Sequence, residues 1–98
     1  MDNDKVLCET PTPGKQATRI DRWKYDAVRR AILDSVENHK DGVLFKELPA
    51  LVEGQLSGEE KKQLGSVSWY TTTVKLDMEV KGEISRVPCA TPQRLVKN

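Results

Sequence analysis

The fold is decided by SVSWYTTTVKLDMEVKG, residues 66–82. Ser66 is a residue type that caps helix N-termini, and Gly82 is the type that most often follows a helix C-terminus. Between them, apolar residues recur at three- and four-residue spacing, as in a helix with buried faces. The stretch therefore predicts one helix over about residues 67–81.

Two strand-like segments follow this helix. Residues 83–87 and 93–97 read as strands, and residues 88–92 between them begin and end with proline. Proline-bounded turns between such runs are typical of antiparallel strand pairs. We expect a C-terminal β-hairpin.

Two further helices and a short strand are expected upstream. Asp21 is a plausible N-cap for a first helix, whose apolar residues continue to Val36, and residues 38–42 end it. Residues 43–45 read as one short buried strand. Residues 46–56 read as a second helix, in which Pro49 is tolerated because it falls in the first turn.

The sequence Ser57-Gly58-Glu59-Glu60 matches a capping box, and it predicts a short helical turn that stops at Gly65. The resulting order of elements is that of an α+β winged helix-turn-helix. This architecture has a three-helix core and a C-terminal β-hairpin wing, with the helix at 67–81 in the recognition position. A generic three-helix bundle with a tail is the alternative, and the two C-terminal strands disfavour it.

We expect residues 19–98 to form this winged-helix domain and residues 1–18 to form an extended N-terminal arm. Residues 10–14, TPTPG, fix two backbone angles at proline and offer no apolar periodicity. Val6 and Leu7 are the residues that could dock the arm onto the domain, and the sequence does not decide whether they do.

Composition narrows the classes of function. The chain has 98 residues, of which 37% are hydrophobic and 32% charged, and no apolar run approaches the ~20 residues of a membrane span. There is no secretory signal pattern, so we expect a cytoplasmic protein without membrane association. Cys8 and Cys89 are expected to be free thiols, and a disulfide between them is the alternative in an oxidising compartment.

The sequence predicts no metal site and no cofactor. Cys8, Cys89 and His39 are too few and too scattered for structural zinc. No nucleophile–base pair, paired-carboxylate pattern or phosphate-cradling glycine loop is present, so we do not expect an enzyme.

Charge is unevenly distributed although the net charge is only +1. Residues 15–31 hold six bases against two acids, and residues 61–98 hold seven bases against three acids. Two basic segments can create a basic face on a near-neutral protein, as in many nucleic-acid binders. The alternative is a mixed surface on which the segments interleave.

The leading hypothesis is therefore a DNA-binding protein of the transcription-regulator type, with the helix at 67–81 in the major groove. At about 100° per residue, this helix leaves a polar strip whose members could reach bases or phosphates: Ser68, Thr71, Thr72 and Lys75, with Glu79 opposing them. Trp69 and Tyr70 lie in the apolar arc and are expected in the core. Bases outside the helix supply the expected phosphate contacts: Lys81, Arg86 and Arg94 on the wing, and Arg29 and Arg30 on the first helix.

The second hypothesis is a winged helix that binds a protein partner without binding DNA, since this fold also serves as an interaction module. The near-neutral charge and the single base on the recognition strip motivate it. The expected partners are thus double-stranded DNA or another protein, and the chain is expected to be a monomer or a weak dimer.

The chain also resembles a small family of uncharacterised bacterial proteins of about this length. The resemblance covers residues 8–96 and implies a winged-helix fold, with no ligand or functional residue assigned. The order of elements is similar to that of MarR-type winged helices, without the terminal helices through which those regulators dimerise. The segments that carry the family resemblance are Trp23-Lys24-Tyr25-Asp26, Arg30-Ala31-Ile32-Leu33, Ser68 to Met78, Gly82-Glu83-Ile84, Arg86-Val87-Pro88 and Pro92-Gln93-Arg94-Leu95.

Overall fold

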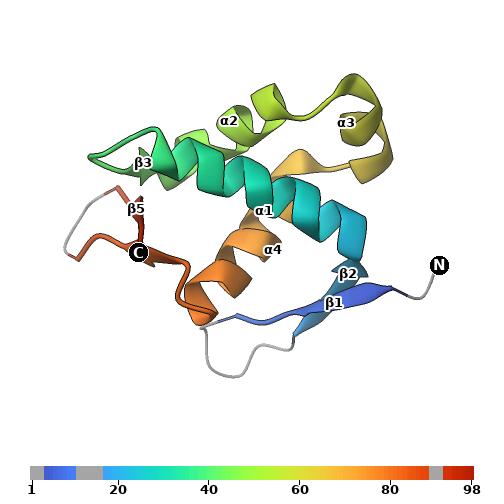
Figure 1. Cartoon of the computed structure of the whole chain (residues 1–98), viewed down its shortest axis with the longest axis horizontal. Helices are drawn as coiled ribbons and strands as arrows, with labels where there is room; N and C mark the ends of the chain where they lie inside the picture. Colours follow the sequence, from blue (N-terminus) through green and yellow to red (C-terminus); the bar gives the residue numbers. More distant parts are fainter. Residues whose placement is uncertain (1–3, 11–16, 89–91) are drawn as a thin grey trace.

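Helices occupy the middle of the computed structural model, and a small antiparallel sheet lies at each end (Figure 1). The structure describes residues 4–10, 17–88 and 92–98. This part of the chain is α+β, with four α-helices and two sheets. The elements are β1 (Lys5–Cys8), β2 (Thr18–Asp21), α1 (Arg22–Glu37), β3 (Val43–Leu44), the 3-10 turn η1 (Phe45–Glu47), α2 (Leu48–Gln55), α3 (Gly58–Leu64), α4 (Val67–Val80), β4 (Ile84–Arg86) and β5 (Arg94–Lys97).

The helix ends follow the local signals. The Ser57 hydroxyl accepts a hydrogen bond from the Glu60 amide at 3.1 Å, and the Glu60 carboxylate accepts one from the Ser57 amide at 2.9 Å. This completes the capping box that starts α3. The Ser66 hydroxyl caps α4 by accepting from the Trp69 amide at 3.2 Å. The predicted positions of α1, α3 and α4 are confirmed.

Asp21 precedes α1 as predicted, but its carboxylate makes no capping hydrogen bond. The reason is that Asp21 is also the last residue of β2, where its carboxylate lies 2.5 Å from the Lys5 ammonium and 3.7 Å from that of Lys24. The Asp21 side chain therefore links β2 to β1 and does not cap α1.

Within the described part of the N-terminal segment, Lys5–Cys8 form the strand β1. β1 runs antiparallel to β2, with Val6 opposite Ile20 and Cys8 opposite Thr18. Cys8 and Ile20 are buried among the core residues, so this hairpin contributes to the core. β2 begins at Thr18, so it spans the boundary at residues 18 and 19 that was expected between arm and domain.

The second sheet joins segments that are far apart in the sequence. Its strand order is β3-β5-β4, and both pairings are antiparallel. Val43, Ile84 and Leu95 are buried, one from each strand, and they direct this sheet onto the helices. Residues 89–91 of the predicted turn lie outside the described residues.

The core lies between α1 and the helices α2 and α4. Val28 and Ile32 of α1, Val52 of α2 and Val74 and Met78 of α4 are fully buried. At about 1.5–3 kcal/mol for each fully buried aliphatic side chain, these five residues contribute substantially to the stability of the fold. One side of α4 is consequently fixed against the core, and the other side is left to the surface.

Candidate interaction surface

Two of the four α4 residues that we expected in a DNA groove are buried instead. Thr71 is fully buried, and Lys75 is only 2% exposed. The Lys75 ammonium lies 4.4 Å from the centroid of the Phe45 ring and 2.8 Å from the Glu79 carboxylate. A long aliphatic stem ending in a cation can be buried when an aromatic face and a carboxylate receive the charge. Lys75 therefore belongs to the interior, whereas Ser68 is exposed and Thr72 is partly exposed.

Burial also affects the charged state of Lys75. Desolvation lowers the pKa of this ammonium, and the ion pair with Glu79 opposes the shift without cancelling it. The same carboxylate lies 2.6 Å from the guanidinium of Arg86 on β4. Two cations thus share one carboxylate, and the Arg86 side chain remains 46% exposed. This cluster braces β4 against α4.

The outward side of α4 presents large apolar side chains. Trp69 is 46% exposed and Val80 is 43% exposed, while Thr73 and Leu76 between them are partly exposed. We call these four residues the outer stripe. The expectation that Trp69 lies in the core is wrong, because α1 and α2 pack on the opposite side of the helix, where Val74 and Met78 point. Tyr70 is partly buried and packs against the core.

Aromatic side chains extend the outer stripe from α4 toward α1. The Trp69 and Tyr70 rings meet edge to face, with centroids 4.8 Å apart. The Lys24 ammonium lies 5.2 Å from the Tyr70 ring centroid and 5.8 Å from that of Trp23. Trp23 is 41% exposed. Exposed tryptophans of this kind are enriched where proteins bind other proteins.

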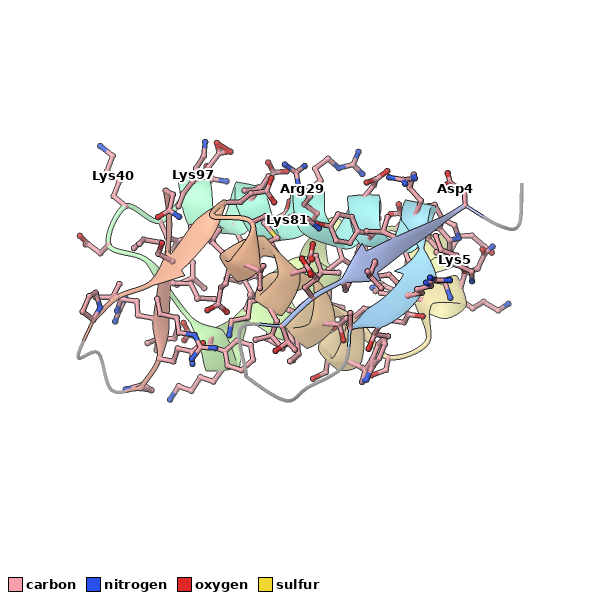
Figure 2. All side chains as sticks on the ribbon, turned by 90° about the horizontal axis from the view of Figure 1, so that it is seen from below. Asp4, Lys5, Arg29, Lys40, Lys81 and Lys97 are labelled. Atoms are coloured by element: carbon pink, nitrogen blue, oxygen red, sulfur yellow. The ribbon has the colours of Figure 1, made fainter. Side chains whose placement is uncertain are left out.

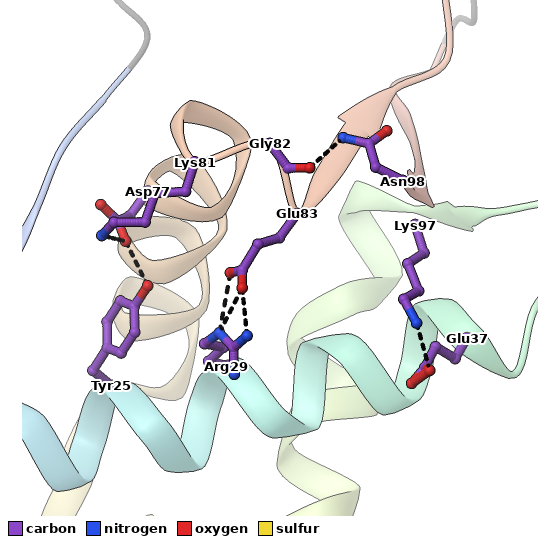
Figure 3. Close-up of polar contacts among 9 residues, drawn as sticks. All are labelled: Tyr25, Arg29, Glu37, Asp77, Lys81, Gly82, Glu83, Lys97 and Asn98. Carbon is purple, nitrogen blue, oxygen red and sulfur yellow. Dashed lines mark hydrogen bonds and ion pairs between the residues drawn. The ribbon is translucent and has the colours of Figure 1, made fainter.

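The buried carboxylate of Asp77 is the centre of a second network (Figure 3). It accepts hydrogen bonds from the Tyr25 hydroxyl and the Lys81 ammonium, both at 2.5 Å, and from the Glu9 amide at 2.9 Å. Burial alone would raise the pKa of Asp77, but these three donors outweigh it and hold the pKa below its usual value. The network fixes the N-terminal segment to α1 and α4.

Burial and the nearby Asp77 carboxylate also raise the pKa of the Cys8 thiol to about 11. A buried thiol with a raised pKa is a poor nucleophile, so Cys8 has a packing role. Cys89 lies outside the described residues.

The remaining bases proposed for phosphate contact are dispersed. Arg29 forms an ion pair with Glu83, as Figure 3 shows, and Arg94 donates to the carbonyls of Asp41 and Gly42 at 3.4 and 3.3 Å. Arg30 is exposed and has no ion-pair partner within the described ranges. Figure 2 places Arg29 and Lys81 near the middle of the molecule, with Lys40 and Lys97 toward one end and Lys5 toward the other. The structure does not gather these bases on the exposed side of α4.

Other possible sites are weaker. A pocket of about 450 Å³ lies beside β3 and the start of α2, and its lining residues include His39, Val43, Lys46 and Leu51. Over residues 4–10, 17–88 and 92–98, no three His, Cys, Asp or Glu side chains are placed to hold a metal ion. Within the same ranges, no helix has the length and apolar character needed to cross a membrane.

Sequence reasoning missed the Asp77 network and the outer stripe. An acidic residue inside an otherwise apolar helical face was the available signal for Asp77, since such a residue requires buried donors. For the stripe, the 4-3-4 spacing of Trp69, Thr73, Leu76 and Val80 was visible, but their exposure was not.

Comparison with known proteins identifies the family and no closer relative. No curated protein and no solved structure matches the chain significantly. A family model described as a family of unknown function, DUF6958, matches residues 5–95, which include every described helix and strand at least in part. The chain therefore belongs to the DUF6958 family.

Proposed function

We propose that this chain is a winged-helix module that recognises another protein through the outward side of α4. The winged-helix assignment is supported by the order of elements and by the strand order β3-β5-β4. In that arrangement, the short strand after the first helix pairs with the second strand of the C-terminal hairpin. α4 then occupies the position of a recognition helix, preceded by the additional short helix α3.

One observation carries the choice of a protein partner. The exposed side of α4 presents Trp69 and Val80, while all three charged residues of the helix, Lys75, Asp77 and Glu79, are buried or nearly so. Phosphate backbones are bound by exposed cations, whereas protein interfaces centre on aromatic and aliphatic side chains. The composition of this surface suits a protein.

The test compares proteins captured by the wild-type chain and by the double variant Trp69→Ser/Val80→Ser. A matched control is Lys62→Ser, which alters an exposed residue of α3. A captured protein that the double variant loses and the control retains is then purified and titrated into the isotope-labelled chain. We expect amide shifts centred on α4. Shifts centred on another surface would refute the proposal, and so would equal capture by all three chains if the chain also does not associate with itself through α4.

DNA binding is the second candidate, and the distribution of ion pairs is the observation that favours it. Lys75 and Arg86 share Glu79, and Lys5 and Lys24 share Asp21, so each cluster keeps one positive charge in excess. In this alternative, the hydroxyls of α4 and the surrounding bases contact the phosphates: Ser68, Thr72, Lys81, Arg86, Arg94, Arg29 and Arg30.

An amide shift titration with a short DNA duplex at 50 and 200 mM salt separates the two candidates. Three to six phosphate contacts predict binding that weakens about 40- to 1,800-fold over this fourfold change in salt. Salt-sensitive shifts at Thr72, Arg86 and Arg94 would favour DNA. Absence of shifts at both salt concentrations would remove this candidate and leave the protein-recognition proposal standing.

A further inference from the structure

We infer that the partner of the outer stripe is a second copy of this chain, bound with the two α4 helices antiparallel. This inference rests on the proposed function and names its partner. Three observations support it: the spacing of the stripe residues, the sizes of their side chains, and the pairing of the charged residues of α4 within the chain.

The spacing of the outer stripe reads the same in both directions. Trp69, Thr73, Leu76 and Val80 are separated by four, three and four residues. At about 100° per residue, the four lie within about 60° on one side of the helix, as along the seam of a coiled coil. Their midpoint falls between Val74 and Lys75. An antiparallel copy turned about that midpoint therefore places Trp69 against the partner's Val80 and Thr73 against the partner's Leu76.

The residues that would meet are complementary in size. The largest side chain of the stripe, Trp69, faces the branched Val80, and the small Thr73 faces Leu76. Trp69 and Val80 are also its most exposed members, at 46% and 43%. A two-fold interface uses the same surface on both subunits, so a stripe that is complementary to its own reversed copy meets the requirement of such an interface.

Charge permits the two copies to approach. Lys75 is 2% exposed, Asp77 is fully buried, and the Glu79 side chain is 9% exposed. Each of these charges has an ion-pair partner within its own chain. Pairing two α4 helices therefore buries no unpaired charge of α4 and brings no like charges of the stripe together. Ser68 and Thr72, beside the stripe, are small and let the helices approach closely.

The first measurement is sedimentation equilibrium of the full chain between about 5 μM and 1 mM. A single-helix seam is smaller than ~1,200 Å², the lower limit of standard interfaces, so we expect weak, reversible dimerisation with a Kd on the order of 100 μM. Val80→Glu is expected to weaken the dimer at least tenfold. The control Lys62→Glu, which changes charge on exposed α3, is expected to leave the Kd unchanged.

A mixing experiment tests the antiparallel register. Thr73→Lys and Leu76→Glu chains are each expected to be monomeric alone, because each would place two uncompensated charges in the seam. In an antiparallel dimer of one chain of each kind, the introduced lysine lies against the introduced glutamate. The other contact keeps its wild-type pair of Thr73 and Leu76. We expect the mixture to recover the wild-type Kd within about threefold. A parallel dimer would show no such recovery, because positions 73 and 76 would each face the same position of the other copy.

The possible outcomes are distinct. A wild-type chain that is monomeric at 1 mM, or variants that dimerise as the wild type does, overturn the self-pairing inference. In the first case, loss of a captured protein by Trp69→Ser/Val80→Ser would still support the proposed function with a different partner. If neither dimerisation nor capture depends on the outer stripe, both proposals fail. Amide spectra of every variant establish that the fold is retained.

Discussion

Replacing Asp77 with alanine is expected to destabilise the protein by about 3–4 kcal/mol at pH 7. The buried Tyr25 hydroxyl loses a charged acceptor, which costs about 1.5–3 kcal/mol. The Glu9 amide, which is partly buried, loses its side-chain acceptor and adds about 1 kcal/mol. Lys81 is 43% exposed, so its ion pair adds less than about 1 kcal/mol.

Urea unfolding followed by circular dichroism measures this difference, and the melting temperature should fall by about 12 °C or more for a domain of this size. The matched control is Asp34→Ala, an exposed acid of α1 without an ion pair in the described part of the chain, which should change stability by less than about 0.5 kcal/mol. Hydrogen exchange at the β1 amides should accelerate in Asp77→Ala, because Glu9 is no longer fixed to α4. A loss below about 1 kcal/mol, with β1 protection retained, would refute a network that holds the N-terminal segment.

The Asp77 carboxylate also makes the folded protein less stable as the pH falls. The pKa of Asp77 is lowered in the folded state, so its contribution is present above the unfolded value of about 3.9. It is lost as the pH falls below that value and through the folded-state pKa. Asp77→Asn should therefore remove part of the loss of stability seen below about pH 4.

Three further predictions concern the Lys75–Glu79 ion pair, two glycines and Cys8. Glu79→Gln should cost about 3 kcal/mol in urea unfolding because it leaves the buried Lys75 cation uncompensated, whereas Lys75→Met should stay within about 1 kcal/mol; equal losses would contradict this account. Gly42→Ala should destabilise the protein by more than about 1 kcal/mol, because Gly42 has φ +94° and a Cβ there would lie 2.8 Å from a β5 carbonyl. Gly54→Ala should instead stabilise α2 by about 0.5 kcal/mol, because a Cβ at Gly54 meets open space. Thermal unfolding of both glycine variants checks the opposite signs. Alkylation of Cys8 at pH 8, followed by mass spectrometry, should be about 100-fold slower in the folded protein than in urea, because the pKa rises from 9.0 to about 11; equal rates would show that the thiol is accessible.

Local signals were sufficient to predict most of the helices. Ser57 and Ser66 each cap a backbone amide three residues later, so the start of α3 and of α4 can be predicted from a short segment of sequence. The hairpin β1–β2 could not be predicted in this way. Its pairing joins Val6 to Ile20 and is secured by Asp77, which lies about 70 residues away from Glu9.

The exposed side of α4 could not be predicted, because a helical projection shows where each side chain points but not which element packs against it. Apolar residues cover a wide arc of this helix, and either side of that arc could have faced the core. The choice is made by the packing of α1 and α2, which cover Val74 and Met78, and by Phe45, which covers Lys75. For this reason Thr71 and Lys75, which were expected to contact DNA, are buried, and Trp69 is exposed.

The position of β5 in the middle of its sheet has a kinetic consequence. Val43 of β3 pairs with Leu95 of β5, more than 50 residues later, so this sheet closes only after a long loop has been brought together. Hydrogen bonds within each helix join residues only four apart, and contacts between α1 and α2 span shorter separations than Val43–Leu95. We therefore expect these helices to be established in the folding transition state before β3 and β5 meet. Weakening the Val43–Leu95 contact should therefore speed unfolding far more than it slows folding. The sheet that completes the native structure is then also the part whose opening sets the lifetime of the folded chain.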